Sequence, residues 1–203
     1  MQDIVSAVLL AMENSGFLQV EVSARHVHLS APDVAKLFGE GATLTPVREL
    51  SQPGQFLCEE RVTVIGPKGK FPNTAVLGPE RSRTQIELSR GDTFALGITA
   101  PIRDSGDLEG SADIIIEGPK GQVTISQGAI IAKRHIHVPA TFANKHGLKD
   151  GDIVDVEVFT DRPVVLKEVL LRVSDQYNYR MHIDVDEANA ANVSGFTLGR
   201  VIK

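Results

Sequence analysis

The feature that most constrains the fold is an internal repeat built around two pairs of histidines. Residues 25–29 read Arg-His-Val-His-Leu, and residues 134–138 read Arg-His-Ile-His-Val. A stretch with helical character follows each copy, at 31–38 and at 139–147. Recurrence of one supersecondary unit indicates two halves with similar structures. We therefore expect two related β-lobes that face each other.

Two shorter segments also recur. Gly-Pro-Lys-Gly stands at 66–69 and at 118–121, and we expect hairpin turns there because the spacing of a phosphate-binding loop is absent. Leu-Ser-Arg-Gly-Asp at 88–92 returns as Leu-Lys-Asp-Gly-Asp at 148–152. Since adjacent Gly and Asp are a turn signal, both copies are expected to lead into strands.

Short apolar runs separated by Gly, Pro and Asp dominate the chain from about residue 60 onward. Examples are 62–65, 113–116 and 153–158, and residues 17–28 also alternate like a strand. This spacing favours barrels or sandwiches over alternating strand-helix units. The charge-rich stretch 103–111 is expected to be a flexible loop. The predicted fold class is mainly β, with two pseudo-symmetric β-barrel lobes, short capping α-helices and an N-terminal helix.

The N-terminal helix is predicted over residues 2–13, whose apolar side chains share one broad face before Gly16 ends the pattern. His146 precedes Gly147 at the expected end of a later helix. Its position suits a C-terminal cap better than a metal ligand.

Charge and cysteine content narrow the class of protein. The 203 residues carry a formal charge of −5, which argues against nucleic acid or an anionic membrane as the main partner. No apolar run approaches the roughly 20 residues of a membrane span. The single cysteine, Cys58, excludes a disulfide within the chain and favours a reducing, cytoplasmic setting. We expect Cys58 to be a small buried residue.

The histidine pairs carry the predicted chemistry. Residues i and i+2 of a strand point to the same face, so His26 and His28 can converge on one ion, and His135 and His137 on another. Imidazole suits zinc and its transition-metal neighbours. Two such pairs in matching contexts predict two divalent metal ions.

Further ligands are less clear from the residues alone. His182 is a third histidine candidate, and Asp184 and Asp186 share its face, where they can orient ligands. Carboxylates that can join a histidine pair are numerous: Glu59, Glu60 and Glu87.

The chain lacks the sequence features of several other classes of metal-binding protein. A cupin normally has a glutamate three or four residues beyond its H-x-H segment, yet residues 29–33 read Leu-Ser-Ala-Pro-Asp. The H-x-H-x-D-H pattern of metallo-β-lactamases is also absent. Structural zinc sites are usually closed and rich in cysteine, whereas six histidines and one cysteine favour an open catalytic site. From the residues alone, a metal-dependent hydrolase or cupin-like metalloenzyme and a non-enzymatic metal sensor stay open as alternatives.

Four ordered segments carry a resemblance to a known family. They are 23–30, 77–89, 132–138 and 181–190, which contain both H-x-H pairs, the Gly-Pro-Glu-Arg-Ser-Arg run and the Met-His-Ile-Asp run. Together they resemble the PduL-type phosphotransacylases, or phosphate propanoyltransferases, of bacterial microcompartments that degrade diols. The resemblance runs from about residue 18 to the C-terminus.

The resemblance implies a reaction and a site. The reaction converts a short-chain acyl-CoA, such as propanoyl-CoA or acetyl-CoA, and phosphate reversibly into an acyl phosphate and CoA. The implied site holds two Zn²⁺ per chain between the two lobes. The implied ligands of one zinc are His26, His28 and Glu87, and those of the other are His135, His137 and His182. Arg81 matches the arginine that takes phosphate.

The resemblance also implies a domain arrangement and a setting. Residues 18–25 with 133–203 would form one barrel lobe, residues 26–132 the other, and residues 1–17 an N-terminal amphipathic helix that is a candidate targeting segment. The expected location is the bacterial cytoplasm inside a microcompartment for propanediol degradation. The expected partners are shell or cargo proteins and further copies of the chain, in a homo-oligomer.

Overall fold

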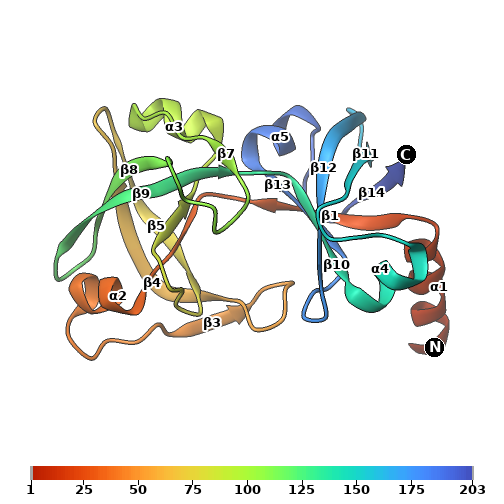
Figure 1. The fold of residues 1–203 in the computed structure, drawn as a ribbon, viewed down its shortest axis with the longest axis horizontal. Helices are drawn as coiled ribbons and strands as arrows, with labels where there is room; N and C mark the ends of the chain where they lie inside the picture. Colours follow the sequence, from red (N-terminus) through yellow and green to blue (C-terminus); the bar gives the residue numbers. More distant parts are fainter. Residues whose placement is uncertain (1, 203) are drawn as a thin grey trace. The chain divides into compact units, whose positions relative to one another are not determined.

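The computed structural model describes residues 2–202, which form fourteen strands and five helices (Figure 1). Two compact units divide the chain. One unit combines the chain up to Ser23 with the chain from Arg134 onward, and the other runs from Ala24 to Lys133. No helix among the described residues is long and apolar enough to cross a membrane.

The unit that holds both chain ends is a closed barrel of six strands. Their order around the barrel is β1-β13-β10-β12-β11-β14. Its core is a row of side chains at matching register positions, because Val20 pairs with Met181, Met181 with Ile136, and Ile136 with Leu171. All four are almost fully buried. The elements are α1 (Gln2–Asn14), β1 (Phe17–Ser23), β10 (His135–Pro139), α4 (Ala140–His146), β11 (Ile153–Phe159), β12 (Val164–Ser174), β13 (Arg180–Asp184), α5 (Val185–Ala190) and β14 (Thr197–Ile202).

The second unit also closes into a barrel. Its ring is β4-β5-β2-β6-β9-β8, closed because β8 pairs with both β4 and β9, while β3 and β7 extend the sheet at β4 and β9. Val27 of β2 lies between Val76 and Ile86, and all three are fully buried. The elements are β2 (His26–His28), α2 (Ala31–Phe38), β3 (Pro46–Glu49), β4 (Phe56–Ile65), β5 (Lys70–Gly78), β6 (Gln85–Glu87), α3 (Arg90–Leu96), β7 (Ile102–Arg103), β8 (Ala112–Glu117) and β9 (Gln122–Ala132).

The two barrels share one pairing pattern, which confirms the predicted pseudo-symmetry. In one barrel β10 is parallel to β12 and antiparallel to β13, and β13 is parallel to β1. In the other, β2 is parallel to β5 and antiparallel to β6, and β6 is parallel to β9. Each H-x-H strand therefore occupies the same place in its own barrel.

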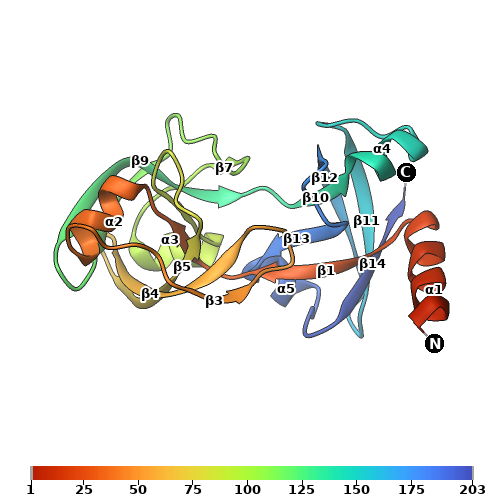
Figure 2. The ribbon, with the colours of Figure 1, turned by 90° about the horizontal axis from the view of Figure 1, so that it is seen from below.

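The predicted helices after the H-x-H segments are confirmed as α2 and α4. The N-terminal helix is confirmed as α1, which lies at one end of its barrel beside the start of β1 (Figure 2). His146 closes α4, and Gly147 after it adopts the left-handed conformation that ends a helix, as predicted.

The prediction that 88–92 leads into a strand is wrong, because this segment opens α3. The Ser89 hydroxyl accepts the Asp92 backbone N–H, and the Asp92 carboxylate accepts the Ser89 N–H. This reciprocal capping box stabilises a helix start, and it outweighs the turn signal of Gly-Asp. The second copy, 148–152, leads into β11 as expected.

The two Gly-Pro-Lys-Gly segments are hairpin turns, as predicted, but both lie in the same barrel. One joins β4 to β5 and the other joins β8 to β9. The Lys68 N–H donates to the Leu96 carbonyl at the end of α3, and the Lys120 N–H donates to the Leu37 carbonyl at the end of α2. This repeat therefore reflects symmetry within one barrel and not between the two units.

Candidate metal centre

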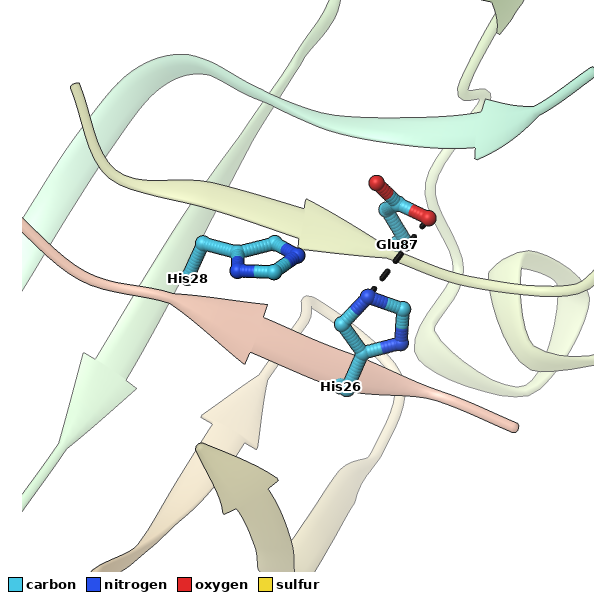
Figure 3. A group of neighbouring side chains, drawn as sticks. All are labelled: His26, His28 and Glu87. Atoms are coloured by element: carbon cyan, nitrogen blue, oxygen red, sulfur yellow. Dashed lines mark ion pairs between the residues drawn. The ribbon is translucent and has the colours of Figure 1, made fainter. Parts of the chain in front are cut away.

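Strand pairing gathers the first set of candidate ligands. The register of β2 and β6 places His26 directly opposite Glu87, and His28 lies two residues along the same strand. Because Val27 and Ile86 fill the barrel interior, the histidines and Glu87 occupy the opposite face of the two strands. Their ligand atoms all lie within 4.8 Å of one another, and Figure 3 shows the three side chains turned toward a common point.

Hydrogen bonding selects the tautomer of His26. Its Nδ1 lies 2.8 Å from the Ala24 carbonyl oxygen, which accepts only from a protonated nitrogen. In the neutral ring the lone pair is therefore on Nε2, which lies 3.5 Å from a Glu87 carboxylate oxygen. A metal-binding histidine is commonly oriented by a backbone carbonyl that accepts a hydrogen bond from the ring nitrogen that does not bind the metal.

Glu87 is buried and still ionised. Burial alone raises its pKa, but the neighbouring His26 and His28, the Ser105 hydroxyl and Arg81 together lower the pKa to about 2. Ser105 Oγ donates to Oε1 over 2.8 Å, and Gln85 Nε2 donates to the same oxygen over 2.6 Å. The carboxylate therefore carries its charge at neutral pH, as a metal ligand must.

His28 is held in its neutral form. Burial lowers its pKa well below the ordinary value, and electrostatic interactions with His26 and Arg81 lower it further. Two imidazoles and one ionised carboxylate are a donor set found in catalytic zinc sites. The residues present at this position thus fit a zinc ion.

Arg81 lies beside this triad. Its backbone N–H donates to the Leu29 carbonyl over 2.8 Å, which fixes it next to the end of β2. Its Nη1 donates to the Ser105 hydroxyl over 3.1 Å. The predicted phosphate-binding arginine and the predicted metal ligand Glu87 therefore contact the same serine.

Sequence reasoning missed Ser105 and Gln85. Ser105 lies in the stretch expected to be a flexible loop, yet the loop is fastened because the Gly106 N–H donates to Gln85 Oε1 over 2.8 Å. Gln85 stands two residues before Glu87 on the same strand face, a signal that was available. No short-range sequence pattern identifies Ser105, because its hydrogen-bond partners are 18 to 24 residues away in the chain.

The second set of candidate ligands lies in the other barrel. His135 and His137 are on β10, and His182 on β13 pairs directly with His135. The three ring centroids are 4.7 to 5.3 Å apart. His182 thus holds in its barrel the place that Glu87 holds in the other. Across residues 2–202, only the first triad brings all of its ligand atoms within 4.8 Å of one another.

Carboxylates near the second triad make contacts that the sequence did not predict. Asp184 caps α5 by accepting the Glu187 N–H over 2.8 Å. Glu21 of β1, which was not predicted, lies 3.9 Å from Nδ1 of His182. Glu59 and Glu60 lie on β4, outside the group formed by Glu87 and its two histidines.

The arginine that precedes each H-x-H pair forms an equivalent ion pair in both barrels. Arg25 donates twice to Asp92, over 3.0 and 2.8 Å, and Arg134 donates to Glu187 over 2.8 Å. Both acids belong to the capping box of the helix that follows the strand with the third candidate ligand. The same arrangement therefore joins the two strands that carry the candidate ligands in each unit.

Comparison with known proteins decides the family. A model of the phosphate propanoyltransferase family matches residues 19–194. The chain is 48% identical over 203 residues to a phosphate propanoyltransferase of Clostridioides difficile, covering all of this chain and 97% of that protein. It is 54% identical over 173 residues to one of Thermotoga maritima, covering 85% and 82%. The chain belongs to the phosphate propanoyltransferase family.

Membership of this family confirms the resemblance drawn from the four sequence segments. As a phosphate propanoyltransferase family member, the chain is an enzyme that transfers an acyl group to phosphate. A similar protein from Enterococcus faecalis, 45% identical over 205 residues, covers all of this chain and 97% of its own length. The metal-dependent hydrolase and the non-enzymatic metal sensor are therefore not supported.

Proposed function

We propose that the chain transfers a short acyl group, propanoyl or acetyl, between CoA and phosphate in either direction, with two Zn²⁺ bound per chain. The proposed ligand sets are His26, His28 and Glu87 for one ion, and His135, His137 and His182 for the other. The observation that carries the proposal is the shared contact of Glu87 and Arg81 with Ser105. It joins a metal-ligand candidate and an anion-binding cation in one site.

The chemistry follows from the charges around this site. Zinc, when bound, would stabilise the departing CoA thiolate and polarise the acyl carbonyl. The planar guanidinium of Arg81 can hold two phosphate oxygens, so that a third oxygen attacks the acyl carbon while the carbon–sulfur bond breaks. Holding phosphate beside the thioester supplies much of the rate acceleration.

A direct transfer agrees with the state of Cys58. The thiol is fully buried, and burial raises its pKa to about 11. A protonated, inaccessible thiol is a poor nucleophile. The acyl group therefore passes to phosphate without a cysteine-bound intermediate.

The test combines metal analysis with an assay of CoA release from propanoyl-CoA. We expect two zinc ions per chain and release that requires phosphate, and Glu87→Gln should lower the metal content to about one. Release without phosphate would indicate a hydrolase, and bound metal without release a non-enzymatic role. Fewer than one ion per chain after expression in zinc-supplemented medium would overturn the metal assignment.

We also propose that α1 docks the enzyme to microcompartment shell or cargo proteins in a propanediol-degrading bacterium. Ile4 and Val8, one turn apart on the same face of the helix, expose 69% and 52% of their surface, and Leu10 on another side exposes 54%. The helix is tied to its own barrel at its far end, where Lys145 donates to Asn14 over 3.0 Å. An apolar face left open in this way suits a docking segment.

Removal of α1 tests the docking role. A chain that begins at Gly16 should keep its metal and its turnover but no longer co-purify with shells. Aggregation or loss of stability on truncation would instead show that α1 covers its own barrel. Homo-oligomer formation, the remaining part of this proposal, is tested by light scattering on the full chain, where a monomer mass would contradict it.

A further inference from the structure

The Ser105 hydroxyl contacts three functional side chains at once. Arg81 Nη1 lies 3.1 Å from Oγ, Gln85 Nε2 lies 2.9 Å away, and Glu87 Oε1 lies 2.8 Å away. A serine hydroxyl has one hydrogen to donate and two lone pairs to accept with. Three contacts therefore use its full hydrogen-bonding capacity.

The chemistry of the partners fixes the direction of each bond. Guanidinium and amide nitrogens only donate, so Oγ accepts from both Arg81 and Gln85. An ionised carboxylate only accepts, so the single hydroxyl hydrogen points to Glu87. The serine thus relays a hydrogen-bonded connection from the cation to the carboxylate.

Gln85 fastens the loop that carries this serine. Its side chain is almost fully buried, its Oε1 accepts the Gly106 N–H, and its Nε2 donates to both Ser105 and Glu87. Behind the loop, Asp104 forms an ion pair with Lys133 over 3.1 Å, and the Leu108 side chain is buried. The hydroxyl is therefore held in place from both sides of the loop.

We propose that Ser105 is a positioning residue that holds Arg81 and Glu87 in one preorganised unit, so that phosphate binding and metal retention depend on the same hydroxyl. The inference rests on the roles proposed above for Arg81 and Glu87. A bound anion draws Arg81 toward itself, and Ser105 limits how far the guanidinium can turn. The side chain acts through its neighbours and not on the reacting atoms.

Three variants separate this role from a general effect on folding. Ser105→Ala removes all three hydrogen bonds, Ser105→Thr keeps a hydroxyl, and Ser111→Ala is the matched control. Ser111 lies at the end of the same loop segment, is also buried, and its hydroxyl makes no hydrogen bond with the described residues. Ser111→Ala should therefore leave both readouts unchanged.

The two readouts are zinc transfer from the resting protein to a chromophoric chelator, measured without substrate, and the KM values for phosphate and propanoyl-CoA. For Ser105→Ala we expect faster zinc loss and a phosphate KM raised roughly 10-fold, the order expected for a lost hydrogen bond to a charged group. The KM for propanoyl-CoA should change less than about 2-fold, the small change expected when only the phosphate contact is affected. Ser105→Thr should restore both properties.

Several outcomes would overturn the proposal. The proposal fails if Ser105→Ala behaves like Ser111→Ala in both measurements. It also fails if Ser105→Ala changes only zinc transfer or only the phosphate KM. An equal rise in both KM values with a lowered unfolding temperature would show a merely structural role. If the unmodified chain releases no CoA with phosphate, the proposed function fails, while the zinc-transfer comparison still tests the link between Ser105 and Glu87.

Discussion

Arg81, the proposed phosphate-binding residue, is held in place by two contacts within the chain. Its backbone is tied to Leu29, and its guanidinium to Ser105. Burial, the largest influence on each group, lowers the pKa of His28 and raises that of Glu87, and the positive charge of Arg81 lowers the pKa of both. At the residue scale the site is therefore a coupled set of charges in which no member acts alone.

Replacing Arg81 by lysine tests this coupling. Arg81→Lys exchanges a planar, two-pronged donor for a point charge, so the phosphate KM should rise by about 10-fold while the propanoyl-CoA KM changes little. Steady-state kinetics with each substrate varied in turn measures the two KM values separately. Arg83→Lys, two residues away and exposed, is the control and should behave like the unmodified chain. An unchanged phosphate KM would remove Arg81 from phosphate binding.

At the scale of elements, the two strands that carry the candidate ligands in each barrel are joined through the start of a helix. Asp92 both completes the capping box of α3 and accepts from Arg25. Its side chain is only 8% exposed, against 41% for Arg25. Loss of the acid removes the ion pair and the helix cap, whereas loss of the arginine removes the ion pair and an exposed contact with the Phe71 ring, whose centroid lies 4.0 Å from the guanidinium carbon.

Removing either residue of this ion pair should lower the free energy of unfolding, but by different amounts. Arg25→Ala should lower the free energy of unfolding by about 1 kcal/mol, and Asp92→Ala by about 2 kcal/mol because the helix cap is lost as well. Urea unfolding of both variants gives the comparison. Arg103→Ala is the control, because the side chains of Arg103 and Asp107, which form an ion pair, are both partly exposed. Equal costs for Arg25→Ala and Asp92→Ala would contradict the double role of Asp92.

The hairpin turn at Gly66 is a second element-scale test. A Cβ atom there would overlap the Leu96 backbone carbonyl at the end of α3, and backbone cannot move aside cheaply. Gly66→Ala should therefore destabilise the fold by about 2 kcal/mol or more. Gly41→Ala meets no atom within 4 Å and strains only a positive φ of 76°, so it should cost about 1 kcal/mol. If thermal unfolding showed the same loss of stability for Gly66→Ala and Gly41→Ala, the close contact between Gly66 and Leu96 would be contradicted.

At the scale of the whole molecule, each barrel carries its own triad of candidate ligands on matching strands. Ligand binding to the folded state alone raises stability, by about 2.7 kcal/mol when the free ligand is at 100 times its Kd. Metal removal should therefore affect the stability of the chain as well as its activity.

Metal removal provides the corresponding prediction. A strong chelator should abolish phosphate-dependent CoA release and lower the unfolding temperature, and added zinc or cobalt should restore part of both. Differential scanning calorimetry of treated and reloaded protein measures the shift. Calcium added in place of zinc is the control, because a site with two or three imidazole donors does not suit it. Identical unfolding temperatures with and without chelator would contradict metal-linked stability.

Much of the local structure was predictable because it depends on short-range rules. The two-residue period put His26 and His28 on one face of a strand, and the helices after both H-x-H pairs followed from the segments beside them. Gly-Pro-Lys-Gly was read correctly as a turn. The 88–92 segment was not, because a capping box and a turn use the same residue types.

By itself, the sequence determined the mainly β class, the two H-x-H strands and, through the resemblance, the family. Only the tertiary structure brought Ser105 to Arg81 and Glu87. The residues alone left Glu59, Glu60 and Glu87 open, the resemblance implied Glu87, and the structure brings Glu87 together with His26 and His28. The physical reason is strand register. His26 and Glu87 are 61 positions apart and meet because β2 and β6 pair in one alignment. Local periodicity tells which face a side chain occupies, whereas its neighbours on that face depend on how the barrel closes.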